Sequence, residues 1–281
     1  MVIDNQKMLN ELCTKLSNMD IISIDTEFSR RNTYYAKLSI IQVKAGKHSA
    51  IIDALTNLDL TAFNQILIND KILKLFHAPR EDLEIFYHLF GGLPHNIFDI
   101  QIAADICGFG KQLSYDDLCY KVYNVSIDKT YQKANWLKRP IKEEMLNYAM
   151  QDVEYLEVIY KKLYKIITEN NLTKKYNTQL QSLLDVKNYF VKPEDAWRKV
   201  RFYRESEEFI TKMQILASYR EEQVKHLDIP RKHFILDEDL IMLCQALPVT
   251  EENFKKLKLK SRYLHKQQYS DQIINLCKKL V

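Results

Sequence analysis

Two acidic side chains directly follow an apolar run near the start of the chain. The segment IISIDTEF, residues 21–28, is rich in β-branched residues and predicts a buried strand that leads into Asp25 and Glu27. Because side chains alternate between the faces of a strand, the two carboxylates point to the same side. Such a pair repels and loses hydration. Either both acids lie in water at a surface strand end, or a positive group lies between them.

A third acidic position comes from a strand-to-helix junction. In FHAPREDLEIF, residues 76–86, a strand is expected to end at Phe76 and a helix to begin near Pro79, a residue favoured at the first helical position. Asp82 then lies in the first turn of the helix. Acids in that turn are also favourable for the helix dipole, so Asp82 alone has a structural explanation.

The fourth acidic position lies inside a predicted helix. In NYAMQDVEYL, residues 147–156, Tyr148 and Asp152 are four residues apart and therefore share one helix face. In such a pair the tyrosine ring commonly packs against apolar neighbours while its hydroxyl stays in water.

If these elements bring the four carboxylates together, the site has no protein cation to balance it. Ligands that are all oxygen favour hard cations, Mg²⁺ or Mn²⁺. Two such ions, roughly 4 Å apart, activate water and stabilise the leaving oxygen in a displacement at phosphorus. Tyr148, one turn before Asp152, would then aim its hydroxyl at the attacking water.

The elements that must position these residues form two groups. The first part of the chain alternates strand and helix patterns, which predicts an α/β sheet with helices packed on its faces. The predicted strands are 21–28, 38–43, 49–54 and 71–76, and the predicted helices are 61–68, 80–90, 99–107, 114–123 and 141–168. From about residue 192 the strand signals stop, and amphipathic helical patterns at 205–224, 237–246 and 261–280 predict a separate small helical domain.

Composition excludes several classes of protein. The 281 residues are 46% hydrophobic and 28% charged, and no apolar run approaches 18 residues, so no transmembrane helix is expected. No basic segment followed by an apolar stretch marks a secretory signal. The five scattered cysteines form no CxxC motif, which favours a reducing compartment and disfavours zinc or a disulfide framework. With 5 glycines and no glycine-rich phosphate loop, nucleotide binding of that kind is not expected.

The positive charge is concentrated toward the end of the chain. Residues 1–185 contain 22 Lys and Arg against 23 Asp and Glu, whereas residues 186–281 contain 19 against 14. The segment KKLKLKSRYLHK, residues 255–266, holds six Lys and Arg and no acid. This run is either a solvated helix end or a surface that follows nucleic-acid phosphates.

The acidic clusters resemble the three motifs of the DEDD superfamily of 3′–5′ exonucleases. The matching segments are DTEF at 25–28, HAPREDLEIF at 77–86 and YAMQDVEYL at 148–156. Further segments extend the resemblance to the ribonuclease D family over nearly the whole chain: RRNTYYAKLSIIQV, FDIQIAADICG, DKTYQKANWLKRP and the tail from DAWRKVR. Asn147 stands where the histidine subclass carries its His, so the resemblance is to the tyrosine subclass.

The resemblance implies a fold, domains and roles. It implies an RNase H-like exonuclease fold, a mixed sheet flanked by helices, followed by one all-α HRDC-like helical domain. We expect an exonuclease domain at 1–170, a linker or bridging helical segment at 171–204 and an HRDC-like nucleic-acid-binding domain at 205–281. The acids implied as metal ligands are Asp25, Glu27, Asp82 and Asp152, with Tyr148 positioning the nucleophilic water.

Contacts to nucleic acid are expected from residues around the acids and from the basic run. Each also has a structural explanation, such as packing, a local hydrogen bond or a solvated helix end. The candidates are Phe28, Tyr35, Gln42, His77, Lys129, Trp136, Arg139, Lys256, Lys258, Lys260, Arg262 and Tyr263.

These observations predict a divalent-metal-dependent 3′→5′ exoribonuclease that releases 5′-mononucleotides, using two ions of Mg²⁺ or Mn²⁺. The resemblance implies a cytoplasmic enzyme that trims tRNA precursors, and also admits other small structured RNAs, with no membrane and no obligate protein partner. Two alternatives stay open: a DNA-directed 3′–5′ exonuclease of the same superfamily, and a non-catalytic RNA-binding adaptor. The lack of an attached polymerase or helicase motor disfavours the first, and the presence of all four acids and the tyrosine disfavours the second.

Overall fold

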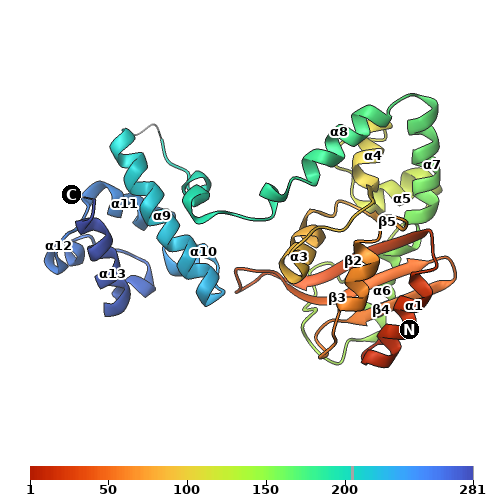
Figure 1. Ribbon diagram of the computed structural model, residues 1–281, viewed down its shortest axis with the longest axis horizontal. Helices are drawn as coiled ribbons and strands as arrows, with labels where there is room; N and C mark the ends of the chain where they lie inside the picture. The colour runs from red at the N-terminus through yellow and green to blue at the C-terminus, as the bar shows by residue number, and fades with distance from the viewer. Residues whose placement is uncertain (204–205, 281) are drawn as a thin grey trace. The chain divides into compact units, whose positions relative to one another are not determined.

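The computed structural model describes residues 1–203 and 206–280. The chain divides into two compact units (Figure 1). The N-terminal unit comprises Met1–Ser29 and Ala36–Tyr189, and the C-terminal unit comprises Arg30–Tyr35 and Phe190–Val281. The predicted segment 171–204 is therefore shared between the units, and the predicted boundary at 204 and 205 lies outside the described residues.

A six-stranded mixed sheet forms the centre of the N-terminal unit. β2, β3 and β4 pair antiparallel in the middle, while β1, β5 and β6 add parallel pairings at the two sides. In spatial order the strands are β1 (Val2–Ile3), β4 (His48–Asp53), β3 (Lys37–Ala45), β2 (Ile21–Ser29), β5 (Leu73–Phe76) and β6 (Ile97–Asp99). The mixed α/β sheet predicted from the sequence is confirmed.

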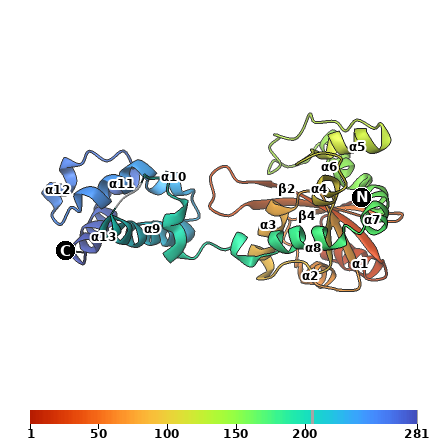
Figure 2. The ribbon, with the colours of Figure 1, turned by 90° about the horizontal axis from the view of Figure 1, so that it is seen from above.

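Helices cover both faces of this sheet, as Figure 2 shows for α2 and α6 on opposite sides of the strands. On one face lie α1 (Gln6–Leu16), α2 (Thr61–Leu67) and α3 (Arg80–Phe90). Against the other face and the β5–β6 side pack α4 (Ile100–Ile106), α5 (Tyr115–Tyr123), α6 (Glu143–Glu154), α7 (Leu156–Glu169) and α8 (Thr173–Leu183). A short 3₁₀ turn, η1 (Val186–Asn188), follows.

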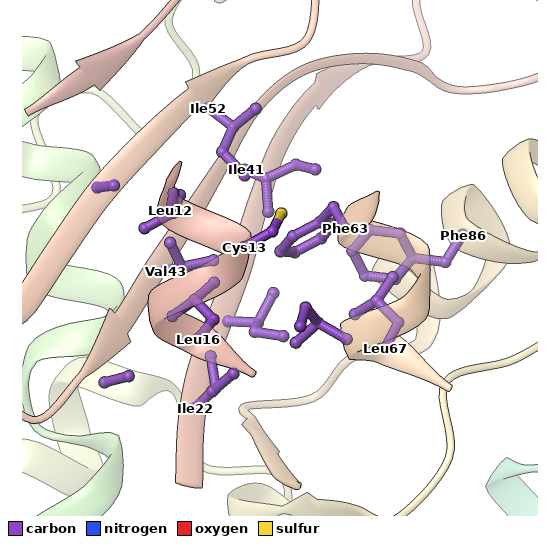
Figure 3. Packing of buried hydrophobic residues seen from close by; sticks show 14 of the residues in the cluster. Leu12, Cys13, Leu16, Ile22, Ile41, Val43, Ile52, Phe63, Leu67 and Phe86 are labelled. Carbon is purple, nitrogen blue, oxygen red and sulfur yellow. The ribbon is translucent and has the colours of Figure 1, made fainter. Parts of the chain in front are cut away.

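The largest core lies between α1, α2, α3 and the sheet. Leu12, Cys13 and Leu16 of α1 face the strand residues Ile41 and Val43 (Figure 3). These side chains are buried, and each large aliphatic group removed from water contributes about 1.5–3 kcal/mol to folding. The apolar core packs against β2, the strand that carries the first acidic motif, and against its neighbour β3.

All the regular elements among the described residues of the C-terminal unit are helical, and they surround a separate apolar core that includes Met213, Leu216 and Phe234. Its elements are η2 (Pro193–Lys199), α9 (Glu207–Leu227), α10 (Arg231–Phe234), α11 (Asp237–Ala246), α12 (Glu251–Lys256), η3 (Arg262–His265) and α13 (Gln267–Lys278). The predicted helical domain is thus observed, although residues 261–280 form a 3₁₀ turn and a helix rather than one helix. No helix in the described part of the chain is long and apolar enough to cross a membrane.

Candidate active site

β2 carries the first acidic pair along an edge that its neighbour leaves open. Asp25 lies opposite Gln42 of β3, and Glu27 lies opposite Ile40. On the other side, β5 pairs only with Ile21–Ser23. The part of β2 that holds both acids therefore extends beyond β5, where another element can approach it.

α3 brings Asp82 to this edge. Asp82 lies in the first turn of the helix and is buried, at 7% exposure. The hydroxyl of Thr26, between the two acids of β2, donates a hydrogen bond to Oδ1 of Asp82. This bond ties the first motif to the second.

α6 supplies Tyr148 and Asp152 by packing across β2, β3 and β4. Tyr148 is buried, and its ring lies 6.1 Å from that of Trp136. At the end of α6, Nζ of Lys44 on β3 forms an ion pair of 2.6 Å with Glu154, two residues after Asp152. These contacts fix the helix face that Tyr148 and Asp152 share.

The four carboxylates interact electrostatically. Burial and the charges of Asp82, Asp152 and Glu27 raise the pKa of Asp25 well above its usual value. Burial, followed by the charges of Asp152 and Asp82, raises the pKa of Glu27 to about 9. Burial raises the pKa of Asp82 to about 6 and that of Asp152 to about 7. The three motifs therefore form one acidic cluster, as the sequence predicted.

No ion pair among the described residues neutralises any of these four carboxylates. Among the same residues, no group of His, Cys, Asp or Glu already has the spacing of a finished metal site. Both observations are expected of carboxylates that repel each other, since a cation would draw them together. Four oxygen donors with surplus negative charge fit a hard divalent ion, and the cluster contains no sulfur ligand that would favour a softer metal.

Gln42 lies directly beside the acidic cluster. Its side chain is completely buried, and Nε2 donates to Oδ2 of Asp25 at 3.3 Å. Its Oε1 atom has no hydrogen-bond partner among the described residues. Gln42 therefore orients Asp25, and its burial excludes the direct contact with nucleic acid that the sequence suggested.

Two further candidates for RNA contact point inward. Trp136 is 2% exposed and packs against Tyr148 and Ile40. The guanidinium of Arg139 binds both carboxylate oxygens of Asp53, at 2.6 and 2.7 Å, and donates its other N–H groups to the Trp136 carbonyl, the Lys138 carbonyl and Ser39. The expected phosphate contact of Arg139 is thus replaced by an anchor that holds the segment before α6 on the sheet.

His77 also has a local role. Nε2 of its ring lies 3.1 Å from the carbonyl of Leu113, and the ring lies 5.6 Å from that of Tyr115. Burial lowers the pKa of His77 to about 4, so the ring is neutral near pH 7. The local hydrogen bond agrees with the structural explanation given above, and the predicted contact of His77 with nucleic acid stays a prediction.

Three further candidates for nucleic-acid contact are half-buried or exposed. Phe28 is half-buried against the core of the N-terminal unit. Lys129 is 53% exposed and pairs with Asp116 at 2.8 Å. Tyr35 is half-buried in the C-terminal unit, with its ring 4.8 Å from that of Tyr34. Their predicted contacts with nucleic acid stay predictions.

The basic run 255–266 is partly neutralised by its own neighbours. Lys256 pairs with Glu252 at 2.8 Å, and Lys260 pairs with Glu238 at 2.7 Å. Tyr263 stacks edge-on against Phe234 at 5.3 Å. No ion pair of Lys258 or Arg262 occurs among residues 1–203 and 206–280. The run therefore presents less free charge than its composition suggested.

Thr26 is a site residue that the sequence did not single out. It lies between the two acids of β2, and its hydroxyl donates a hydrogen bond to Asp82, 56 residues further along the chain. The available signal was strand alternation, which sends Thr26 away from Asp25 and Glu27. Alternation alone does not predict that Asp82 is the hydrogen-bond partner of Thr26.

Comparisons with known proteins place this geometry among nucleases. Residues 1–168 match the family model described as 3′-5′ exonuclease. The chain is 30% identical over 267 residues to ribonuclease D of Nitrobacter hamburgensis, covering 95% of this chain and 70% of that protein. It is 36% identical over 244 residues to ribonuclease D of Bartonella henselae, covering 86% of this chain and 60% of that protein.

A solved structure is similar over the full chain. The crystal structure of Escherichia coli RNase D, described as an exoribonuclease involved in structured RNA processing, superposes with a TM-score of 0.91 at 28% identity. The match covers 100% of this chain and 74% of that one. The chain thus spans between 60% and 74% of the length of these relatives.

Proposed function

Because the chain belongs to the ribonuclease D family of 3′–5′ exonucleases, we propose that it is a metal-dependent 3′→5′ exoribonuclease that releases 5′-mononucleotides. The observation that carries the proposal is the cluster of four carboxylates, in which burial raises all four pKa values and the neighbouring acids add to the shift at Asp25 and Glu27. A protein keeps such a destabilising arrangement where a positive ligand relieves it.

Each element of the site has a task in this reaction. Asp25, Glu27, Asp82 and Asp152 would hold divalent ions, Mg²⁺ or Mn²⁺, against the last phosphodiester of the RNA. Two such ions supply a water of lowered pKa and a counter-charge for the leaving 3′ oxygen. Thr26 and Gln42 hold the side chains of Asp82 and Asp25 in place.

Tyr148 positions the attacking water. Burial and the neighbouring carboxylates raise the pKa of its phenol, so the hydroxyl keeps its proton and can donate a hydrogen bond. Its ring is held between Trp136 and Tyr131. A hydroxyl fixed in this way orients the water without exchanging a proton itself.

The substrate that we propose is the 3′ end of RNA, with precursor tRNA as the main class and other small structured RNAs as further substrates. The Escherichia coli relative, described as acting in structured RNA processing, supports this assignment. Such a role places the enzyme in the cytoplasm. The C-terminal unit would hold the RNA as an HRDC-like domain, and Lys258 and Arg262 are its candidate contacts in the run 255–266.

A digestion with matched substrates tests the proposal. Purified protein is incubated with a precursor tRNA labelled at its 5′ end, with Mg²⁺, with Mn²⁺ and with EDTA, beside DNA of the same sequence. We expect stepwise shortening of the RNA from its 3′ end, release of 5′-mononucleotides and no cleavage in EDTA. Preferred cleavage of DNA would favour the DNA-directed alternative, and binding without cleavage in any metal would favour the adaptor.

A further inference from the structure

A pocket in the C-terminal unit gathers positive side chains away from the basic run. It has a volume of about 370 Å³ and is lined by residues of η2, α9, α10 and α11. Four of its lining residues are cations, Lys199, Arg220, Arg231 and Lys232, and two are acids, Asp237 and Glu238. All six belong to the same unit.

Arg220 is the unusual member of this set. Its side chain is 2% exposed, and Nη1 donates to the carbonyl of Ile235 at 3.0 Å and to Asp237 at 2.6 Å. Its Nε atom is buried and has no hydrogen-bond partner in the described part of the chain. A buried donor without an acceptor destabilises the fold, and more so when it belongs to a charged group. Arg220 is among the residues that line the pocket, so an acceptor bound there lies beside this guanidinium.

The two acids of the pocket are already engaged. Asp237 pairs with Nη1 of Arg220, and Glu238 pairs with Lys260 at 2.7 Å. Arg231 pairs with the buried Glu221 at 2.5 Å. Lys199 and Lys232 are exposed and form no ion pair among residues 1–203 and 206–280. Two lysines and the Nε edge of Arg220 therefore remain for an anion.

The start of α11 borders the same pocket. This ten-residue helix begins at Asp237, and Leu236 before it offers no capping side chain. The first N–H groups of a helix and its dipole attract a bound anion. The first turn of α11 carries Asp237, Glu238 and Asp239, which offset this attraction, so an anion in the pocket depends on the basic side chains.

We propose that this pocket binds a backbone phosphate of RNA. A guanidinium presents its Nε side as a fork that matches two oxygens of one phosphate, and Lys199 and Lys232 reach the same anion from the rim. The proposal rests on the proposed function, because RNA is the phosphodiester that such an enzyme handles. The proposed RNA-binding site lies at α9, α10 and α11 and is distinct from the basic run 255–266.

Binding of a labelled RNA in EDTA tests the pocket without turnover. The probe is a fluorescein-labelled 16-nucleotide single-stranded RNA, and its Kd is measured by anisotropy across a series of salt concentrations. For the double variant Lys199→Ala/Lys232→Ala we expect Kd to rise about tenfold and the slope of log K against log salt to fall by about 1–2. Both lysines are exposed, so the fold should survive their loss.

Two further variants complete the design. Lys278→Ala removes one exposed positive charge of the same unit outside the pocket, and its Kd should stay within twofold. Arg220→Lys keeps a charge near Asp237 but removes the fork, and Kd should rise about fivefold. A circular dichroism melt shows whether Arg220→Lys is folded, and if it is not, the double variant alone decides.

Two outcomes overturn the proposal. One is a double variant whose Kd and salt slope equal those of Lys278→Ala. The other is stabilisation by inorganic phosphate in the wild type but not in the double variant, with RNA binding unchanged, which would make this a site for free phosphate. A protein that binds RNA through the pocket yet cleaves none in Mg²⁺ or Mn²⁺ would refute the proposed function and leave the pocket standing.

Discussion

Two groups of acidic side chains, one in each unit, are treated in opposite ways. In the N-terminal unit four carboxylates lie together, and no cation of the described residues pairs with them. In the C-terminal unit the buried acids are satisfied: Glu221 pairs with Arg231, and Asp239 accepts hydrogen bonds from the Ser261 and Lys260 amides. Compensated charges specify a structure, whereas uncompensated like charges indicate a site for a ligand of opposite charge.

Arg220 tests this distinction inside the C-terminal unit. Its Nε is the buried side-chain atom without a partner among the described residues of that unit. Its charge is paired with Asp237, so what indicates a ligand here is an unsatisfied buried donor and not an unpaired charge. The comparison therefore supports both a cation site in one unit and an anion site in the other.

The largest expected effect comes from neutralising one acid of the cluster. In Asp25→Asn or Asp152→Asn we expect turnover of RNA to fall at least about 10³-fold, because the ions lose a charged ligand. We expect the metal-free protein to gain about 1–2 kcal/mol of stability, since like charges are relieved. Activity assays and urea unfolding in EDTA measure both.

Asp4→Asn, at an exposed position, is the matched control and should change neither quantity. Wild-type turnover in either site variant would remove the assignment of that acid. A loss of stability in the metal-free site variants would mean that the cluster is a structural element.

The opposite result is expected for a compensated acid. Glu221→Gln keeps an acceptor for the Tyr34 hydroxyl but leaves the positive charge of Arg231 without its partner. Arg231 is partly exposed, so we expect a loss of about 2–3 kcal/mol, somewhat below the cost of breaking a fully buried pair. Calorimetry measures the loss, and turnover at saturating RNA should be retained in the folded protein.

Glu251→Gln breaks an exposed ion pair with Lys255 and serves as the control, with an expected change within about 0.5 kcal/mol. Equal effects of the two substitutions would show that burial does not separate these pairs.

A smaller effect is expected from removing one hydroxyl beside the cluster. Tyr148→Phe keeps the ring between Trp136 and Tyr131 and removes the group that orients water. We expect kcat to fall about 10–100-fold, the usual range for one positioned group, with KM and thermal stability nearly unchanged. Tyr131→Phe, the neighbouring ring, should stay within twofold in kcat. Equal losses in both variants would assign the hydroxyls a role in packing.

The sequence predicted the acidic cluster because each of its members follows from a local rule. Strand alternation places Asp25 and Glu27 together, and helical periodicity places Tyr148 and Asp152 on one face. The central strands and α3 were predicted for the same reason. β1 was not, since its two residues gain their conformation from parallel pairing with β4.

The predictions that were wrong concern residues whose contact partners lie far away in the sequence. Arg139 turns inward because Asp53, 86 residues away, accepts its guanidinium, and no local pattern announces that pair. Likewise, the predicted helix 141–168 divides into two helices at Tyr155. The amide of Tyr155 donates a hydrogen bond to the hydroxyl of Tyr115, 40 residues earlier in the chain. Local patterns were enough to predict which acids form the cluster. Which neighbouring side chains can contact a substrate depends on contacts between residues far apart in the sequence.

The smallest effect is a dependence of metal binding on pH. The pKa values of Asp82, Asp152 and Glu27 are raised to about 6, 7 and 9 in the metal-free protein, above the values of about 4 expected in the unfolded chain. The folded protein therefore holds more protons than the unfolded chain between about pH 4 and 9, and its metal-free stability falls as pH rises through that window. A divalent ion must displace those protons, so it binds more tightly at high pH. We expect 5 mM Mn²⁺ to raise Tm by several degrees more at pH 8.5 than at pH 6, a difference that Asp152→Asn should reduce. If the Mn²⁺-induced shift in Tm were the same at both pH values, the raised pKa values would not belong to the metal ligands, and the contrast between the two units would lose its chemical basis.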